Sequence, residues 1–161
     1  MAQAKTYLGA VEGFLAQKRI AFIGLSRQKQ DIGNALVKEF ERQGYEVLPV
    51  NPNTSEIMGK KCFARVQDIV PAPEAALLLT SQAITDSVLR ECEQAHIKRI
   101  WLFRGGIGGA VTQTGVAFCR EHAMEVVPGA CPLMFLEPVK GIHRFHRFCS
   151  KLLGSYPQHE N

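Results

Sequence analysis

Two glycines and the polar residues between them form the first segment that could bind a ligand. The stretch from Gly24 to Gly33 carries Ser26, Arg27 and Lys29 and leads into an amphipathic run. Glycine lets backbone approach a ligand closely, and the start of a helix offers amides and a positive dipole. The pattern therefore predicts a phosphate-binding loop. It is neither a G-x-G-x-x-G fingerprint, because Ser26 replaces the second glycine, nor a P-loop. The alternative is an ordinary loop whose glycines serve turns.

A second group of candidate residues consists of Asn51, Pro52 and Asn53. A fold that binds NAD usually carries an acidic residue at this place, after its second strand. The neutral amides found here can donate to and accept from a base or a sugar. The usual NAD anchor is missing, although N-P-N is also a good turn sequence, so a purely structural role stays open.

A glycine-rich run and a cysteine complete the set of candidates. Arg104, Gly105 and Gly106 begin the run RGGIGG, whose amides could complete an anion site or form a flexible connection. Cys131, in the run GACP, could react if its pKa were lowered, or it could be a small buried hydrophobic residue.

The elements that must position these residues alternate between strand and helix. Apolar runs predict strands at 19–24, 46–50, 75–80, 99–104 and 125–128, and amphipathic runs predict helices at 32–43, 81–95 and 111–123. Further helices are expected within 1–17 and at 138–153, with a tail at 154–161. This alternation predicts an α/β fold, a Rossmann-like, doubly wound, parallel five-stranded sheet of order 3-2-1-4-5 with helices on both faces. Such sheets bind ligands beyond the carboxyl ends of their strands, where the candidate residues fall.

Composition limits the classes of function. A chain of 161 residues with 46% hydrophobic and 21% charged residues predicts a single domain over 1–161. Its net charge of +4 is spread along the chain, which favours a small anionic ligand over nucleic acid. Without a long apolar run or a signal-peptide pattern, we expect no membrane association and a cytoplasmic location. The five cysteines show no CxxC pair, and His143 and His146 lack accompanying ligands, so reduced thiols and no metal are expected.

The most specific motif is GYEVLPVNP at residues 44–52. It is accompanied by Gly24-x-Ser26 with the later Gly33, by Gly59 followed by Cys62, by Trp101-Leu102 before the glycine run, and by Cys131 after the last strand. Over residues 18–136 the chain thereby resembles the small CoA-binding proteins whose fold matches the N-terminal domain of the succinyl-CoA synthetase alpha subunit.

The resemblance implies that the ligand is CoA or an acyl-CoA. The loop from Gly24 to Gly33 would receive the pyrophosphate, residues 51–53 the adenosine end, and Thr80 and Ser81 would line the nucleotide. The adjacent lysines at 60–61 could neutralise the 3′-phosphate or could be solvated loop residues. The synthetase reacts through a phosphorylated histidine in a second domain, which is not expected here, so that chemistry is not carried over.

No Ser/His/Asp arrangement, carboxylate pair or general base stands out among the candidates. We therefore expect a stand-alone CoA-binding protein that acts as a non-catalytic binding or regulatory module. One alternative is a small NAD(P)-dependent oxidoreductase in which Arg27 and Lys29 accept a 2′-phosphate. Another is an interaction subunit of an acyl-CoA enzyme, and self-association into a homo-oligomer also stays open. The candidate ligand contacts are Gly24, Ser26, Arg27, Gly33, Asn51, Pro52, Asn53, Thr80, Ser81, Arg104, Gly105, Gly106 and Cys131.

Overall fold

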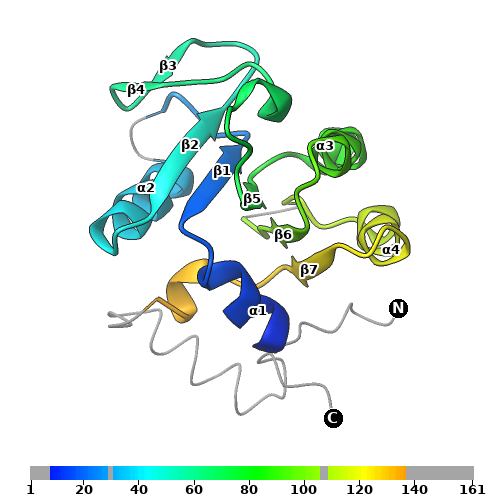
Figure 1. The fold of residues 1–161 in the computed structure, drawn as a ribbon. Helices are drawn as coiled ribbons and strands as arrows, with labels where there is room; N and C mark the ends of the chain where they lie inside the picture. The colour runs from blue at the N-terminus through cyan, green and yellow to red at the C-terminus, as the bar shows by residue number, and fades with distance from the viewer. Residues whose placement is uncertain (1–7, 29–30, 106–108, 137–161) are drawn as a thin grey trace.

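A five-stranded parallel sheet forms the centre of the protein (Figure 1). The computed structural model describes residues 8–28, 31–105 and 109–136. The sheet consists of β1 (Arg19–Ile23), β2 (Glu46–Val50), β5 (Ala75–Leu78), β6 (Arg99–Leu102) and β7 (Glu125–Pro128). The interior positions of these strands are buried, as expected for strands covered on both faces. The predicted Rossmann-like α/β sheet is confirmed.

The predicted strand order 3-2-1-4-5 is wrong. The observed order is β2-β1-β5-β6-β7. Counted along the chain among the strands of this sheet, β5 is the third strand, and it pairs with β1 and not with β2. Pro49 explains why β2 lies at an edge, since proline has no amide to offer a second neighbouring strand. On the outer side of β2, the Phe63 amide donates to the Pro49 carbonyl at 2.9 Å. By contrast, all four residues of β5 are buried and none is proline, which suits a central position.

Two of the described helices cover each face of the sheet. On one face, α1 (Leu8–Leu15) and α2 (Ile32–Arg42) pack on a core that contains the edge-to-face pairs Phe14–Trp101 and Phe22–Phe40, each with ring centroids 5.2 Å apart. On the other face lie α3 (Gln82–Gln94) and α4 (Gln113–Glu121), packed on the second core cluster, which includes Leu89. The predicted helices at 32–43, 81–95 and 111–123 are therefore confirmed, with shorter bounds, and the described part of the predicted N-terminal helix is helical over Leu8–Leu15. The predicted helix at 138–153 and the tail at 154–161 lie outside the described residues.

A hairpin that the sequence patterns did not predict follows β2. It joins β3 (Glu56–Ile57) to β4 (Lys60–Lys61) through Met58 and Gly59, whose φ values of 55° and 74° suit a type I′ turn. Two short 3₁₀ helices complete the described elements, η1 (Val66–Asp68) and η2 (Pro132–Met134). None of the described helices is long and apolar enough to cross a membrane.

Candidate functional site

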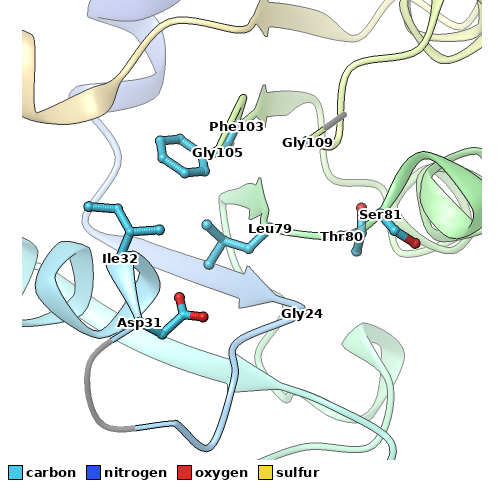
Figure 2. A pocket seen from close by; sticks show the side chains of 9 residues that line it. All are labelled: Gly24, Asp31, Ile32, Leu79, Thr80, Ser81, Phe103, Gly105 and Gly109. Carbon is cyan, nitrogen blue, oxygen red and sulfur yellow. The ribbon is translucent and has the colours of Figure 1, made fainter. Parts of the chain in front are cut away.

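A cavity of about 280 Å³ lies beyond the carboxyl ends of β1, β5 and β6 (Figure 2). Parallel strands bring the ends of three loops together at this edge, as the fold class predicts. Of the predicted contacts, the cavity brings together Gly24, Thr80, Ser81 and Gly105. Its lining also contains residues that sequence reasoning did not single out, namely Asp31, Ile32, Leu79, Phe103 and Gly109.

The two glycines Gly24 and Gly33 both lie close to neighbouring groups. Gly24 has a φ of 91°, and a Cβ there would lie 3.1 Å from the Leu79 carbonyl carbon and from the Thr80 amide nitrogen. A Cβ on Gly33 would lie 2.8 Å from Leu25 Cδ2. The backbone at Gly24 therefore lies close to the connection between β5 and α3, which forms the adjacent cavity wall, and its predicted approach to a ligand stays a prediction.

The polar residues of the same loop have different environments. The Ser26 hydroxyl accepts a hydrogen bond from the Gln28 amide at 3.1 Å, which stabilises the turn, and Arg27 is exposed. Neither residue lines the cavity. A contact between the Arg27 side chain and a ligand would have to form outside the cavity.

Asp31 occupies the start of α2. It is the N-cap residue, and its carboxylate accepts a hydrogen bond from the Gly33 amide at 2.7 Å. The helix start that the sequence offered to a phosphate is thus partly satisfied by the chain's own negative charge. The preference of aspartate for N-caps is a sequence signal that could have revealed this.

The start of α3 is arranged differently. Ser81 is the N-cap by backbone conformation, yet its side chain makes no capping hydrogen bond to the described part of the chain. Thr80 beside it is buried, and its hydroxyl lies 2.8 Å from that of Thr85. In the cavity, the helix start without a side-chain cap is therefore that of α3, and the predicted residues Thr80 and Ser81 both lie there.

Hydrogen bonds of the Asn51 side chain connect the loop after β2 to the loop after β1. Its side-chain amide donates to the Leu25 carbonyl at 2.9 Å, and its Oδ1 accepts from the Asn53 amide at 2.9 Å. Pro52 and Asn53 are exposed, and none of the three residues lines the cavity. The structural role that the sequence left open for N-P-N is therefore present.

The two lysines of the hairpin already have partners. Lys60 forms an ion pair with Glu41, and Lys61 Nζ lies 4.8 Å from the centroid of the Phe63 ring. Neither lysine lines the cavity.

After β6, the described residues 103–105 and 109–110 lie close together. A Cβ on Gly105 would lie 2.6 Å from Phe103 Cε1, and one on Gly109 would lie 2.7 Å from the Phe103 carbonyl oxygen. The Ala110 amide donates to that same carbonyl at 2.8 Å. Arg104 is exposed and does not line the cavity, and the predicted contact Gly106 lies outside the described residues.

Side chains of helix α3 form hydrogen bonds to the residues at the start of α4. Asp86 accepts hydrogen bonds from the hydroxyls of Thr112 (2.7 Å) and Thr114 (2.6 Å), and Gln82 donates to the Val111 carbonyl at 2.9 Å. The bonds from Thr114 and Thr112 lower the pKa of the Asp86 carboxyl. The network connects the α4 start to the helix whose own start lines the cavity.

Cys131 is not part of the cavity lining. It packs against the core on the face of α1 and α2, and burial raises the pKa of its thiol, an effect that backbone amides of residues 133–134 partly oppose. The thiol is therefore protonated at neutral pH, which favours the interpretation of Cys131 as a small hydrophobic residue. Within the described ranges, no group of three or more His, Cys, Asp or Glu could hold a metal, and His143 and His146 lie outside those ranges.

Comparison with known proteins adds a family to this geometry. The family described as "CoA binding domain" matches residues 18–137. The ADP-forming acetate–CoA ligase II of Archaeoglobus fulgidus is 32% identical over 117 residues, which cover 68% of this chain but 17% of the ligase. The uncharacterized protein YneT of Bacillus subtilis is 36% identical over 114 residues, or 71% of this chain and 82% of that protein.

Solved structures support the same fold. A hypothetical protein from Pyrococcus horikoshii superposes with a TM-score of 0.71 at 22% identity and covers 82% of this chain and 94% of its own. A conserved hypothetical protein from Pyrococcus furiosus gives a TM-score of 0.64 at 30% identity over 71% and 95% of the two chains. Because the family match covers the whole sheet and all three loops of the cavity, the chain belongs to the CoA-binding domain family.

Proposed function

We propose that this chain binds CoA or an acyl-CoA in the cavity beyond β1, β5 and β6, and that it acts as a non-catalytic binding or regulatory module. The observation that carries the proposal is the coincidence of the CoA-binding family match with this cavity. The aligned region covers 82% of YneT, so the domain makes up most of that relative. This supports a role for the domain as a free-standing module.

The charges of the lining favour one position for the anionic part of the ligand. The carboxylate of Asp31 opposes a phosphate at the α2 start, whereas the α3 start presents its positive dipole end beside Ser81. The pyrophosphate would therefore lie between Gly24 and Ser81. A cavity of about 280 Å³ is small for a nucleotide of this size. The adenosine end would extend toward the exposed Pro52 and Asn53, after the neighbouring strand β2.

The titratable groups of the lining support binding without turnover. Asp31 is the one titratable side chain among the described lining residues, and it already accepts a hydrogen bond as a helix cap. A nucleophile paired with a base, which acyl transfer would need, is not assembled in that lining.

A second candidate function is that of an interaction subunit of an acyl-CoA ligase. It is favoured by the ADP-forming acetate–CoA ligases among the relatives, of whose lengths the aligned regions cover 13% to 28%. Copurification with a ligase subunit that holds the remaining domains would distinguish this role from that of a free-standing module.

Isothermal titration calorimetry with CoA, NAD, NADP and ATP tests the binding proposal. We expect CoA to bind more tightly than NAD or NADP, and Ser81→Asp to weaken CoA binding at least about fivefold, because two negative charges near 4 Å repel by ~1 kcal/mol or more. Aspartate is a good N-cap residue, so this variant should still fold. Ser87→Asp is the matched control, since Ser87 is an exposed serine of α3 outside the cavity. Equal CoA affinities of the two variants would contradict the proposed site, and tighter binding of NADP than of CoA would favour the oxidoreductase alternative.

A further inference from the structure

The hydroxyls of Thr80 and Thr85 form a buried chain of hydrogen bonds at one wall of the cavity. Thr80 lines the cavity and is 5% exposed, and its Oγ1 lies 2.8 Å from that of Thr85. The Thr85 hydroxyl donates to the Ser81 carbonyl at 3.0 Å. Because a hydroxyl has a single hydrogen, Thr85 must accept in its contact with Thr80, and Thr80 must donate. The Thr80 oxygen therefore keeps only lone pairs, and toward a ligand it is a hydrogen-bond acceptor.

An acceptor at this position discriminates between the groups of a ligand. The lone pairs of Thr80 repel an ionised phosphate oxygen, whereas a hydroxyl or an amide N–H can donate to them. The neighbouring Ser81 side chain makes no capping hydrogen bond to the described part of the chain, so the start of α3 still suits the pyrophosphate. Thr80 thus suits a hydrogen-bond donor that lies next to the phosphates.

The opposite side of the cavity is apolar. Figure 2 shows the side chains of Ile32, Leu79 and Phe103 on one side, with Thr80 and Ser81 on the other. Phe103 belongs to the core cluster beneath α1 and α2, and Leu79 packs against the same cluster, whereas Ile32 is 44% exposed. These three side chains form the apolar side of the cavity. They have no hydrogen-bonding atoms, so they favour contact with hydrocarbon.

We propose that the cavity selects the pantoyl part of CoA, whose hydroxyl donates to Thr80 and whose paired methyl groups pack on the apolar side. The inference rests on the proposed binding of CoA and names the part of the ligand that is recognised. In CoA, the carbon that carries the methyl groups follows the first methylene after the phosphate ester oxygen, and the carbon that carries the hydroxyl comes next. A cavity of about 280 Å³ that receives the pyrophosphate can therefore also hold this adjoining group.

The sugar on the other side of the pyrophosphate fits this lining less well. Where the pantoyl group carries methyl groups, the ribose carries ring and hydroxyl oxygens, which lose their hydrogen bonds to water against an apolar surface. The ribose therefore suits the exposed region near Pro52 and Asn53, toward which the adenosine end is proposed to extend.

Calorimetric titration with CoA and two analogues tests this inference. One analogue lacks the pantoyl hydroxyl and the other lacks the paired methyl groups. We expect the wild-type protein to bind the deoxy analogue at least about fivefold more weakly than CoA, because the buried Thr80 oxygen loses its donor. The demethyl analogue should bind about fourfold more weakly for each methyl group that CoA buries.

Variants assign each preference to its side of the cavity. Thr80→Val has nearly the same shape but no hydroxyl, so it should bind CoA and the deoxy analogue within about twofold of each other, and Thr80→Ser should keep the preference. Ile32→Ala should lessen the preference for CoA over the demethyl analogue at least about twofold and leave the preference for the hydroxyl unchanged. Ile84→Ala is the matched control and should keep both preferences, since Ile84 is an isoleucine of α3 that is 49% exposed and lies outside the cavity.

Equal affinities of the wild-type protein for CoA and both analogues would overturn this inference and leave the proposed function intact. Preferences that persist unchanged in Thr80→Val and Ile32→Ala would also overturn it, because the pantoyl group would then lie elsewhere. Since Ile32 is exposed, Ile32→Ala should fold even where Thr80→Val does not, and its result would then decide. Absence of binding by CoA and both analogues would instead contradict the proposed function itself.

Discussion

The carboxylate of Asp31 is the chain's own negative charge in a cavity proposed to bind an anion. Its hydrogen bond to the Gly33 amide shows that it also stabilises the start of α2. Asp31→Asn separates these two effects, because asparagine caps helices about as well as aspartate but carries no charge. We expect this variant to bind CoA about fivefold more tightly, as the loss of ~1 kcal/mol of repulsion predicts. Titration at low and at physiological ionic strength measures the effect, and the gain should shrink as salt screens it.

Asp68 provides the control for a general change in charge. It is an exposed aspartate that accepts a hydrogen bond from the Arg65 amide at 3.1 Å and does not line the cavity. Asp68→Asn should leave CoA affinity unchanged. Weaker binding in Asp31→Asn, at unchanged thermal stability, would mean that the Asp31 carboxylate contacts the ligand favourably.

The junction between β1 and the β5–α3 connection depends on Gly24. Gly24 and Gly44 both have positive φ values, 91° and 84°, but only Gly24 has backbone atoms where a Cβ would point. Gly44→Ala should therefore lose about 1 kcal/mol of unfolding free energy for its left-handed conformation alone. Gly24→Ala should lose at least about 1 kcal/mol more, because the neighbouring strand end must shift. Urea unfolding of both variants measures the difference.

Comparing Gly24→Ala with Gly44→Ala also shows whether Gly24 is needed for packing or is free to contact a ligand. Equal losses in the two variants would show that the β5–α3 connection yields at little cost, and that Gly24 is then free to serve a ligand. A larger loss of unfolding free energy in Gly24→Ala would mean that any weaker CoA binding by this variant results from displacement of the cavity wall.

The stability of the whole molecule should depend on alkaline pH through its buried thiols. Burial raises the pKa of Cys119 to about 12 and raises that of Cys92 further, from an ordinary value of 9.0. Above pH 9 the unfolded chain loses these protons while the folded chain keeps them, so the stabilisation present below pH 9 is lost as the pH rises toward 12. Each thiol contributes a slope of up to about 1.4 kcal/mol per pH unit. Urea unfolding under reducing conditions between pH 7 and about 10.5 should reveal the decline.

Two alanine variants separate this linkage from simple loss of packing. Cys119→Ala should be less stable at neutral pH but should show a shallower alkaline decline. Val116→Ala, at a buried position of the same helix, should lose packing and keep the wild-type decline. Parallel pH curves for wild type and Cys119→Ala would contradict the role of this thiol.

Local sequence determined the elements of this protein and the edge of the sheet at which its cavity forms. The predicted bounds 46–50 and 125–128 agree with β2 and β7, because a strand buried on both faces is a short run of apolar residues with its own end signals. The position of the site follows from the same information, since parallel strands joined by helices bring their carboxyl-end loops to one edge. Gly24 and Gly105 were identified in this way, whereas Thr80 and Ser81 were expected from the resemblance to the CoA-binding proteins.

The tertiary structure alone decided the strand order and the function of each loop residue. Which strands become neighbours depends on how much surface the whole arrangement buries, and alternative strand orders are compatible with nearly the same local sequence pattern. Pro49 was the one local sign that β2 belonged at an edge. Likewise, Asn51 bonds to Leu25, 26 residues away along the chain, and a Cβ on Gly24 would meet the backbone at Leu79 and Thr80. The cavity lining brings together Ile32, Leu79 and Phe103 from three separate segments of the chain. Such contacts depend on how distant segments pack, and residue patterns within one segment carry no record of them.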